Sequence, residues 1–407
     1  MQDNEKKPVL RFKGFTDPWE QRKLGEIANF SKGVGYSKND LCEEGTPIIL
    51  YGRLYTKYET CIFDVDTFVK EKAGSVYSKG GEVIVPASGE TAEDISIASV
   101  VVKPGILLGG DLNIVSPTAE YDSAFLALTI SSGASHEYLS SLAQGKSVVH
   151  LHNSDIQSVS AKFPTKREQE KIHLLFGKID TLITLHQRKY EKLMNIKKSM
   201  LDKMFPPNGA SVPEIRFKGF TDPWEQRKLD ELGTIVTGST PSTTNDAYYA
   251  DDGLLWVTPT DITKNITCES ARKLSASGQK VARVVPRNTI LVTCIASIGK
   301  NTMLANAGSF NQQINGLTPD ENKYVPYFLL TESVLWSAKM KVLAATGTLQ
   351  IINRTEFSEI KTFLPSFDEQ KRISQYFEKL DILITLHQRK LEKLQNIKKA
   401  CLEKMFV

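Results

Sequence analysis

The chain has 407 residues, of which 41% are hydrophobic and 24% are charged. This composition predicts a globular protein long enough for two or three domains with their own cores. No run of about 18 apolar residues is present, so we expect no membrane-spanning helix, and the polar start MQDNEKKPVL contains no signal-peptide core. The five cysteines are scattered and form no C-x-x-C pair, which favours reduced thiols in a cytoplasmic protein over a disulfide framework or a zinc site.

The first element along the chain is the segment PVLRFKGFTDPWEQRKL at residues 8–24. It returns as PEIRFKGFTDPWEQRKL at residues 213–229, with 15 of 17 positions identical. We call these two copies the frame segments. Such a repeat predicts that the chain is built from two related halves.

Each frame segment is followed by a region with the composition of a folded domain, which we call head 1 (residues 25–165) and head 2 (residues 230–366). Apolar runs rich in β-branched residues are bounded there by Gly, Pro, Asn and Ser turn signals. The clearest runs are GEVIVPA (81–87), SIASVVVKPGILL (96–108), GLLWVTP (253–259) and NTILVTCIASI (288–298). We therefore predict two α/β or α+β domains built around twisted sheets.

A second repeat follows each head. The segment DTLITLHQRKYEKLMNIKKSMLDKMF (180–205) returns as DILITLHQRKLEKLQNIKKACLEKMF (381–406), with 20 of 26 positions identical. A seam with 4,3 spacing continues over about five heptads, and no Pro or Gly interrupts residues 178–204 or 366–405, as in a coiled coil. We predict one helix of roughly 38 residues in each copy, about 57 Å long at 1.5 Å per residue.

The positive charge of the chain is concentrated in these two helices. Residues 166–204 contain ten Lys or Arg and five Asp or Glu, and residues 368–405 contain nine and six. Their net charges of +5 and +3 leave −4 for the remaining residues, because the whole chain carries +4. This balance does not by itself identify a nucleic-acid partner, since DNA readers are usually more basic.

If the two helical seams bury each other, the second helix runs antiparallel to the first. The expected architecture is two globular heads separated by two long antiparallel coiled-coil helices, with a pseudo-twofold internal repeat. The junction between a helix end, KMF, and a frame segment then forms twice, once within continuous chain and once between its two ends. The expected divisions are 1–165 (head 1 with its frame segment), 166–205 (central helix), 206–215 (linker), 216–366 (head 2) and 367–407 (distal helix).

The order of these elements resembles the specificity (S) subunit of type I restriction–modification enzymes. The resemblance covers essentially the whole chain, and its sharpest marks are the frame segments and FPTKREQEKI…ID (163–180) against LPSFDEQKRI…LD (364–381). Head 2 adds TGSTPSTTN (237–245), WVTPTDI (256–262) and NQQINGL (311–317), in the style of a target-recognition domain. Head 1 contains fewer sequence motifs of this kind.

The resemblance implies that each head is a target-recognition domain that reads one half of a bipartite double-stranded DNA sequence, with a spacer set by the helices. It implies two methyltransferase (M) subunits held by the helices and two restriction (R) subunits in the full complex. S-adenosylmethionine, ATP and Mg are expected on those partners and no cofactor on this chain, which would be non-catalytic. A two-headed coiled-coil scaffold that binds proteins and not DNA is the alternative.

The chain's own motifs agree with a non-catalytic role. We find no D/N-P-P-Y/F motif of adenine methyltransferases. The segment AQGKS (143–147) resembles the end of a P-loop, but Ser140 occupies the position of the first glycine. His150 and His152 form an H-x-H pair without a third ligand, so we expect no metal site.

Polar loop residues in both heads are the candidates for DNA contacts, because Asn and Gln suit adenine edges, Arg and Lys suit guanine edges, and many polar groups contact phosphates. The candidates in head 2 are Thr240, Ser242, Thr243, Thr258, Thr260, Lys300, Asn311, Gln312, Gln313, Thr348 and Gln350. Those in head 1 are Arg53, Ser88, Lys146, Ser147 and His150. For each residue an ordinary polar loop or solvated surface is the alternative, and NQQ (311–313) is also compatible with bracing a sheet.

Two glycine-led loops, GKSVVHLH (145–152) and GTLQIIN (347–353), precede the helices at corresponding places in the two heads. We expect them to be loop tips that meet DNA. Tyr51 and Tyr55 in head 1 are expected to pack inside the domain and not to stack on bases.

The candidates for contacts with a partner subunit are Trp19, Trp224, Arg188, Lys189, Arg389 and Lys390. Both tryptophans follow Asp-Pro turns, and we expect them to anchor the frame segments onto the helices, with a partner contact as the alternative. The basic pairs can face partner surfaces or DNA phosphates, or form an ordinary solvated face of a coiled coil.

Four polar residues fall on the predicted seam of the helices. His186 and His387 are expected to form a polar layer that fixes the helix register, in preference to a metal site. Lys197 and Lys398 are expected to extend their ammonium groups to solvent.

Overall fold

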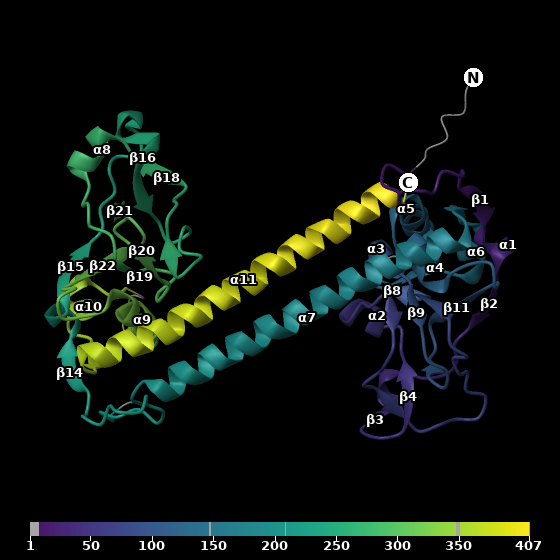
Figure 1. Cartoon of the computed structure of the whole chain (residues 1–407), viewed down its shortest axis with the longest axis horizontal. Coiled ribbons are helices and arrows are strands. Elements are labelled where there is room, and N and C mark those ends of the chain that lie inside the picture. The colour runs from purple at the N-terminus through teal and green to yellow at the C-terminus, as the bar shows by residue number, and fades with distance from the viewer. Residues whose placement is uncertain (1–7, 146–147, 208, 347–350, 407) are drawn as a thin grey trace. The chain divides into compact units, whose positions relative to one another are not determined.

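The computed structural model describes residues 8–145, 148–207, 209–346 and 351–406. The chain divides into two compact units, each of which is described by itself. Unit 1 comprises Met1–Arg188 and Gln388–Val407, and unit 2 comprises Lys189–His387. Each unit therefore combines one head with parts of both long helices (Figure 1).

Unit 1 contains a five-stranded sheet, a four-stranded sheet and two short ladders. In spatial order the five-stranded sheet consists of β2 (Ala28–Lys32), β11 (Leu112–Pro117), β7 (Glu82–Pro86), β9 (Ser99–Val101) and β5 (Cys61–Ile62). The four-stranded sheet consists of β10 (Leu107–Leu108), β4 (Thr46–Ile49), β6 (Phe68–Val69) and β3 (Leu41–Cys42). The ladders pair β1 (Glu20–Lys23) with β13 (Ser160–Phe163) and β8 (Ser88–Gly89) with β12 (Val149–His150). The short helices are α1 (Leu24–Ile27), α2 (Arg53–Thr56), α3 (Ala92–Ile95), α4 (Ser123–Ile130), α5 (Gly133–Leu142), α6 (Asn153–Ser158) and the 3-10 helix η1 (Lys38–Asp40).

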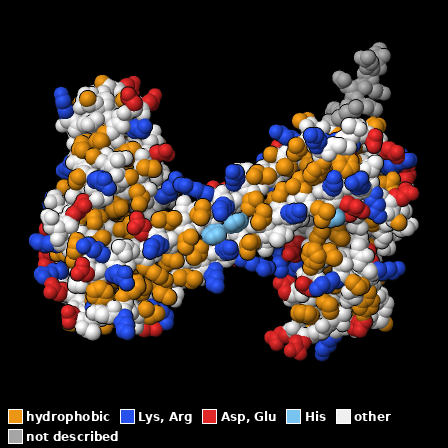
Figure 2. All heavy atoms as spheres, in the orientation of Figure 1, with side chains coloured by type: hydrophobic (Ala, Val, Ile, Leu, Met, Phe, Trp, Pro, Cys, Tyr) orange, Lys and Arg blue, Asp and Glu red, His pale blue; other side chains and the backbone are white. Residues whose placement is uncertain are grey.

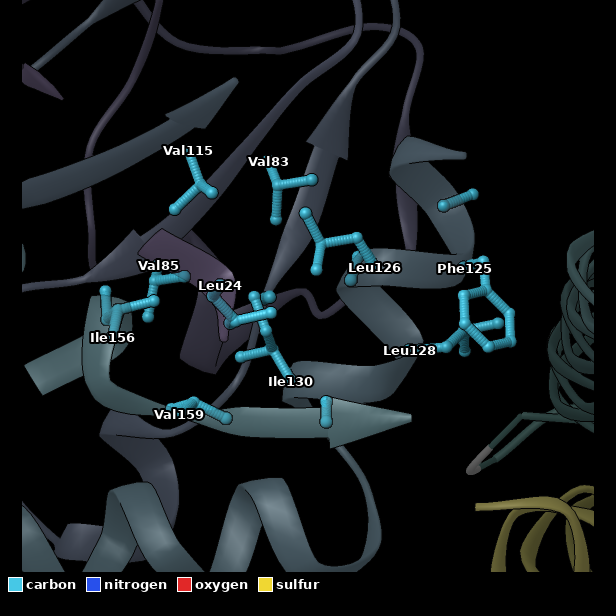
Figure 3. Packing of buried hydrophobic residues seen from close by; sticks show 14 of the residues in the cluster. Leu24, Val83, Val85, Val115, Phe125, Leu126, Leu128, Ile130, Ile156 and Val159 are labelled. Atoms are coloured by element: carbon cyan, nitrogen blue, oxygen red, sulfur yellow. The ribbon is translucent and has the colours of Figure 1, made fainter. Parts of the chain in front are cut away.

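The main core of unit 1 forms where the five-stranded sheet meets α4. Every residue of β7 is buried, and α4 is buried from Ala124 to Ile130, so both elements are enclosed and consist mostly of apolar residues. Val83 and Val115 of the sheet belong to the same cluster as Leu126 of α4 (Figure 3). These contacts explain why the continuous apolar runs of the sequence mark the centre of the head.

Unit 2 contains a five-stranded sheet, a three-stranded sheet and one short ladder. The five-stranded sheet consists of β15 (Gly233–Thr237), β22 (Ile314–Pro319), β19 (Ile290–Thr293), β20 (Asn301–Leu304) and β17 (Ile266–Thr267). The three-stranded sheet consists of β18 (Arg272–Leu274), β16 (Tyr249–Val257) and β21 (Gly308–Phe310), and the ladder pairs β14 (Glu225–Lys228) with β23 (Lys361–Leu364). The helices of the head are α8 (Ala276–Val281), α9 (Pro326–Thr346), α10 (Arg354–Ser358) and the 3-10 helices η2 (Leu229–Glu231) and η3 (Asp246–Tyr248).

The five-stranded sheets of the two heads have the same topology and register. Pro117 pairs with Ala28 in unit 1, and Pro319 pairs with Gly233 in unit 2. In each sheet the last strand, β5 or β17, runs parallel to its neighbour. The second sheets differ, with four strands in one head and three in the other. The predicted mixed helix and sheet domains are confirmed, and the internal repeat extends from the frame segments into a common core sheet.

The two predicted long helices are confirmed as α7 (Lys166–Met204) and α11 (Phe367–Met405), each of 39 residues (teal and yellow in Figure 1). In unit 1, Phe176 of α7 contacts Phe406, and Asp180 pairs with Lys398. Moving forward along α7 therefore means moving backward along α11, so the helices are antiparallel there. The equivalent contacts in unit 2 are Phe377 with Phe205 and Asp381 with Lys197. Within the described ranges, no helix is both long enough and apolar enough to cross a membrane.

The predicted junction between a helix end and a frame segment forms in both units. In unit 1 the Leu10 amide donates a hydrogen bond to the Lys404 carbonyl at 3.1 Å. In unit 2 the Ile215 amide donates to the Lys203 carbonyl at 2.9 Å. Leu10 and Ile215 occupy the same position of the frame segment, and both lysines belong to KMF. The same backbone contact is therefore made twice.

The arginine that follows in each frame segment forms a forked ion pair with the first turn of the adjacent long helix. Arg11 donates from Nε and Nη2 to Glu168 at 2.7 and 2.8 Å, and Arg216 donates in the same way to Glu369 at 2.7 Å twice. The glutamate side chains are 0% and 1% exposed. Because a buried carboxylate needs a partner, this pair fixes where the frame segment crosses the helix.

Candidate nucleic-acid interface

The two glycine-led loops lie beside equivalent strands in the two heads. In head 1, Ser88 of β8 is paired with His150 of β12, and its Oγ lies 3.0 Å from His150 Nδ1. In head 2 the equivalent pairing is an isolated β-bridge between Ile295 and Ile351, and Ile295 follows β19, the middle strand of the sheet, just as Ser88 follows β7. The correspondence predicted for these loops is confirmed for their described parts. Four candidates lie outside the described residues: Lys146, Ser147, Thr348 and Gln350.

Of the two DNA-contact candidates in the β8–β12 ladder, His150 is exposed and Ser88 is buried. Ser88 is 8% exposed, and its carbonyl accepts a hydrogen bond from the Tyr55 hydroxyl. Burial raises the pKa of Tyr55, which keeps this hydroxyl a donor. The Tyr55 ring also packs edge-on against Tyr51, as expected for packing residues. His150 is exposed, so it is the side chain of this ladder that can reach a ligand, and Ser88 supports it.

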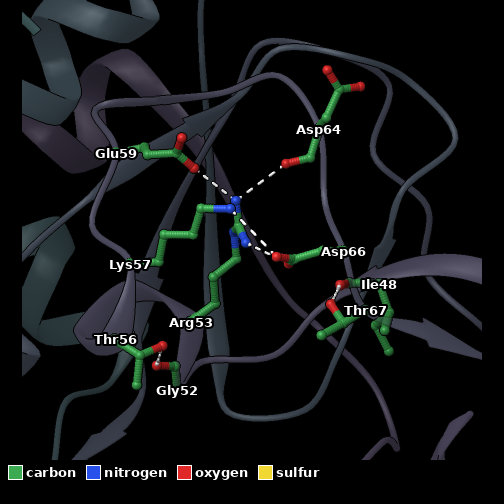
Figure 4. Close-up of polar contacts among 9 residues, drawn as sticks. All are labelled: Ile48, Gly52, Arg53, Thr56, Lys57, Glu59, Asp64, Asp66 and Thr67. Carbon is green, nitrogen blue, oxygen red and sulfur yellow. Dashed lines mark hydrogen bonds and ion pairs between the residues drawn. The ribbon is translucent and has the colours of Figure 1, made fainter. Parts of the chain in front are cut away.

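Arg53 is enclosed within head 1. Its side chain is 7% exposed, and its guanidinium donates to Glu59 Oε2 at 2.6 Å, Asp66 Oδ1 at 3.1 Å and the Asp64 carbonyl at 3.1 Å (Figure 4). Two carboxylates and a carbonyl thus occupy the donors that would read guanine. Freeing them would leave the buried guanidinium without its carboxylate partners, and a buried charge without a partner is destabilising. We therefore correct the prediction for Arg53, which holds the loop after α2 and is excluded from the DNA-contact residues proposed below.

Four loops of head 2 meet at the ends of its strands. The Thr240 hydroxyl, after β15, donates to Gln312 Oε1, which lies between β21 and β22. Lys300 Nζ, which precedes β20, donates at 3.2 Å to the Pro259 carbonyl after β16. Thr240, Lys300 and Gln312 are all exposed. The structure therefore places candidates from distant parts of the sequence on one polar surface.

The loop after β16 is a tight turn built around Asp261. Thr258 donates from its amide and its hydroxyl to Asp261 Oδ2 at 2.8 and 2.6 Å, and its hydroxyl lies 2.8 Å from that of Thr260. Thr258 is half-buried, whereas Thr260 is exposed. Thr258 shapes the turn, and Thr260 is the side chain presented at its tip. Ser242 and Thr243 are exposed as well, in the loop between β15 and β16.

In the NQQ segment (311–313), Asn311 is buried and stabilises the turn, whereas Gln312 is exposed. Asn311 is 9% exposed and donates to Gln313 Oε1 at 3.0 Å, while the Gln313 amide donates back to Asn311 Oδ1 at 3.2 Å. The bracing alternative thus holds for Asn311. Gln312 is exposed and Gln313 is half-buried, so the same turn presents Gln312 to solvent.

Sequence reasoning missed a pair of buried asparagines behind these loops. Asn113 in β11 donates at 2.9 Å to the Leu151 carbonyl, next to His150. Its equivalent Asn315 in β22 donates at 3.2 Å to Cys294 Sγ, next to Ile295. They are 0% and 2% exposed. Both asparagines occupy the same position in equivalent strands. A comparison of the two heads could have found them, but the strand register is needed to show that the strands correspond.

The two tryptophans of the frame segments pack on phenylalanines of their heads, and only Trp224 has a ring contact with a residue at the end of a long helix, Phe205, among the described residues. Trp224 is 3% exposed and lies edge-on to Phe205 and Phe328, with ring centroids 5.8 Å from each. Trp19 is half-buried and lies 5.8 Å from Phe125. Trp224 is therefore corrected as a partner-contact candidate, because the head encloses it. Four candidates for partner contacts are exposed on α7 and α11: Arg188, Lys189, Arg389 and Lys390.

Exposed leucines on the long helices are further candidates that the seam pattern did not include. Leu182 and Leu185 of α7 are 43% and 45% exposed, and the equivalent Leu383 and Leu386 of α11 are both 43% exposed. They lie outside the heptad seam, at spacing i, i+3, and are identical in the two copies. That repeated spacing was the signal that could have found them. Among the described residues, no three His, Cys, Asp or Glu side chains gather as a metal site would require.

Comparison with known proteins links this arrangement to one family. A family model described as the type I restriction modification DNA specificity domain matches the chain twice, over residues 16–195 and 221–396. The type I restriction enzyme HindI specificity subunit of Haemophilus influenzae is 26% identical over 58% of this chain and 50% of its own length. The MjaVIII specificity subunit of Methanocaldococcus jannaschii is 21% identical over 94% of this chain and 91% of its own. The match thus spans about half the length of the first of these relatives.

The fold has a solved counterpart. The crystal structure of a type I restriction–modification S subunit from M. genitalium superposes with a TM-score of 0.69, covering 98% of this chain and 99% of that one. Sequence identity between the two is 14%. At that identity the likeness shows that the two chains share a fold.

Proposed function

The chain belongs to the type I restriction–modification DNA specificity family, and from this premise we propose that it is the non-catalytic specificity subunit of such a system. Each head then reads one half of a bipartite double-stranded DNA target. The observation that carries this proposal is the doubled junction: the frame makes the same contacts in both units, whereas the second sheets of the heads differ. A repeated frame suits two copies of one partner, and dissimilar heads suit two different half sites.

In head 2 the proposed reading surface is the one formed by the converging loops. We assign Gln312 to an adenine edge, with which a glutamine can form paired hydrogen bonds, and Lys300 to guanine or a phosphate. Their exposure and their positions on separate loops support this assignment. The remaining members of the surface, which position DNA through hydroxyl and amide groups, are Thr240, Ser242, Thr260 and Gln313. Thr348 and Gln350, which lie outside the described residues, are proposed from the sequence alone.

In head 1 the proposed contacts come from the loop that ends at β12. His150 is exposed there and is oriented by Ser88, and Lys146 and Ser147 belong to the same loop. A lysine and a serine suit phosphate contacts, which place the head on the duplex.

For the helices we propose the docking of methyltransferase subunits. Exposed leucines beside basic residues form the pattern of an apolar patch with a polar rim, which marks protein interfaces. Figure 2 shows hydrophobic and basic side chains next to one another on the exposed surface of the long helices. Because Leu182 and Leu383 are equivalent, two identical partners can use them. Two restriction subunits join in the full complex, and S-adenosylmethionine, ATP and Mg are bound by these partners.

The proposal is tested by exchanging one head. Residues 230–366 are replaced by the corresponding segment of another specificity subunit, the chain is co-expressed with its methyltransferase subunit, and methylated adenines in host DNA are mapped. We expect one half of the methylated motif to change and the other half to remain. A change in both halves would contradict separate reading, and the absence of any modified motif would favour the protein scaffold.

Single residues are tested in the same assay. Gln312→Ala should weaken binding of the cognate half site by about 1–3 kcal/mol if the glutamine forms paired bonds with a base. Gln226→Ala is a matched control, because Gln226 is exposed on the frame strand β14. An unchanged motif in both variants would remove Gln312 from the reading surface.

A further inference from the structure

An ion pair joins the two long helices within each unit, and the two pairs are equivalent. In unit 1, Lys398 Nζ of α11 lies 2.6 Å from Asp180 Oδ1 of α7. In unit 2, Lys197 Nζ of α7 lies 2.6 Å from Asp381 Oδ1 of α11. The four side chains are between 16% and 28% exposed. The prediction that these lysines extend to solvent is therefore wrong: each is bound to the opposite helix.

The second oxygen of each aspartate is bound by the head of the same unit. Asp180 Oδ2 accepts a hydrogen bond from Thr60 Oγ1 at 3.2 Å. Asp381 Oδ2 accepts from Asn265 Nδ2 at 2.7 Å and from the Tyr327 hydroxyl at 2.8 Å. Hydrogen bonds to an ionised carboxylate are shorter and stronger than neutral ones. Each aspartate thus bridges three parts of its unit: two helices and a head.

The donors Thr60 and Asn265 occupy equivalent positions at the edge strands of the two five-stranded sheets. Thr60 directly precedes β5, and its carbonyl accepts from the Val100 amide at 2.8 Å. Asn265 directly precedes β17, and its carbonyl accepts from the Met303 amide at 2.9 Å. β5 and β17 are the last strands of the two equivalent sheets. Burial, together with the charge of the neighbouring aspartate, raises the pKa of Tyr327, so its hydroxyl stays a donor.

We propose that Asp180 and Asp381 are positioning residues that fix the orientation of each head on the helices of its own unit, and thereby restrict the spacer between the two half sites. This inference rests on the specificity function proposed above. A head that can rock on its helices accepts more than one spacer length, and a carboxylate bound from both sides prevents that motion. The two heads are held unequally, because unit 1 has one long bond and unit 2 has two short ones.

The experiment removes the head donors and keeps the ion pair. The double variant Asn265→Ala with Tyr327→Phe leaves Lys197 and Asp381 in place. The chain is co-expressed with its methyltransferase subunit, and methylation is compared between sites with the cognate spacer and sites whose spacer is one base pair longer or shorter. We expect the ratio of non-cognate to cognate methylation to rise by about tenfold. General loss of stability lowers both values and leaves this ratio unchanged.

The matched control is Thr289→Val. Thr289 is buried directly before β19 of the same sheet, and the partners of its hydroxyl are the Pro286 carbonyl and Thr318, both at 2.9 Å, and not Asp381. Its variant should keep the wild-type ratio. A ratio that stays at the wild-type value in the double variant, or that rises equally in the control, would overturn the proposal.

A charge exchange separates pairing of the helices from positioning of the head. Lys197→Asp with Asp381→Lys restores the cross-helix ion pair but leaves Asn265 and Tyr327 without an acceptor. We expect the methylation ratio to rise as in the double variant. A ratio at the wild-type value would show that helix pairing alone sets the spacer, contrary to the proposal.

A second measurement needs no DNA. Backbone hydrogen exchange of residues 260–267 and 324–331, in the complex with the methyltransferase subunit, should become roughly tenfold faster in the double variant and not in Thr289→Val. Unchanged exchange would overturn the positioning role. A wild-type chain that marks no bipartite motif would refute the specificity function instead, so the two failures are distinguishable.

Discussion

The two junctions between helix and frame segment make the same contacts with different chain connections. In unit 2 the helix end and the frame segment are continuous in sequence, whereas in unit 1 they come from opposite ends of the described chain. Even so, Phe406 packs on Phe125 with ring centroids 5.4 Å apart, and Phe205 packs on Phe328 at 5.5 Å. The comparison teaches that side-chain and backbone contacts, and not chain continuity, define the junction.

Continuity still changes the energetics of the two junctions. A short connecting segment keeps the partners of unit 2 at high effective concentration when a contact is lost. The partners of unit 1 are held together through the long helices and the contacts themselves. The same substitution should therefore loosen unit 1 more than unit 2, and the following variants test that difference.

The largest effect is expected from the aromatic residue at each helix end. Phe406→Ala and Phe205→Ala each remove a buried ring, which typically costs about 3–5 kcal/mol. We expect Phe406→Ala to lower the hydrogen-exchange protection of head 1 more than Phe205→Ala lowers that of head 2. Phe63→Ala is the control, because Phe63 is 56% exposed. Equal losses in the two heads would show that the connecting segment adds no stability.

A somewhat smaller effect is expected at the forked ion pairs. Arg11→Met leaves Glu168 buried without a partner, a change that typically costs about 3 kcal/mol or more. Adding Glu168→Gln should recover much of the loss, because the unpaired charge is then removed. Denaturant unfolding of the single and double variants measures both steps. A double variant as unstable as the single one would mean that packing of the arginine, and not its charge, holds the frame.

A pH-dependent effect should appear in unit 2. Glu332 of α9 is buried and accepts a hydrogen bond from Thr362, which in turn accepts one from Trp336 at 3.1 Å. Ala161 takes the place of Thr362 in the equivalent strand of unit 1. Burial raises the pKa of Glu332 to about 8. In the unfolded chain a glutamate has its ordinary pKa of about 4.3.

Between these two pKa values the folded head keeps a proton that the unfolded chain releases. The contribution of Glu332 to the stability of the head is therefore most favourable below about pH 4.3 and falls as the pH rises towards 8. Glu332→Gln should remove this fall and make head 2 more stable than wild type at pH 8.5. Hydrogen exchange of head 2 at pH 5.5 and 8.5, corrected for intrinsic rates, measures it. A wild-type pH slope that persists in Glu332→Gln would assign the slope to other groups.

The smallest effect is expected from circular permutation. The contact of Leu10 with Lys404 bounds the distance between residues 8 and 406 at about 20 Å, since each intervening residue spans at most about 3.6 Å. A linker of about ten residues can therefore join them, and new ends can open between residues 208 and 209. The permutant should mark the same bipartite motif as the wild-type chain, as measured by methylome sequencing. A permutant that assembles with its partner but marks another motif would contradict the symmetry of the two junctions.

The sequence by itself determined the long-range plan of this protein. A heptad seam without Pro or Gly forms a helix in any context that buries the seam, so α7 and α11 end within a residue or two of the predicted bounds. Nearly identical frame segments and helix ends make the same contacts when the same neighbours are present, so the doubled junction followed from the repeats. The core strands followed from continuous apolar runs, which are stable only when enclosed.

Only the tertiary structure decided which polar groups remain available. Arg53 and Lys300 look alike in sequence, yet one is enclosed by two carboxylates and the other is exposed beside a carbonyl. Lys197 lies on the helical seam, but its partner Asp381 belongs to the other helix. Hydrogen bonds and ion pairs act over about 3 Å between residues far apart in the chain, so no local pattern encodes their partners. The residues proposed to read DNA depend on that same proximity, which is set by how the loops meet at the ends of the sheets.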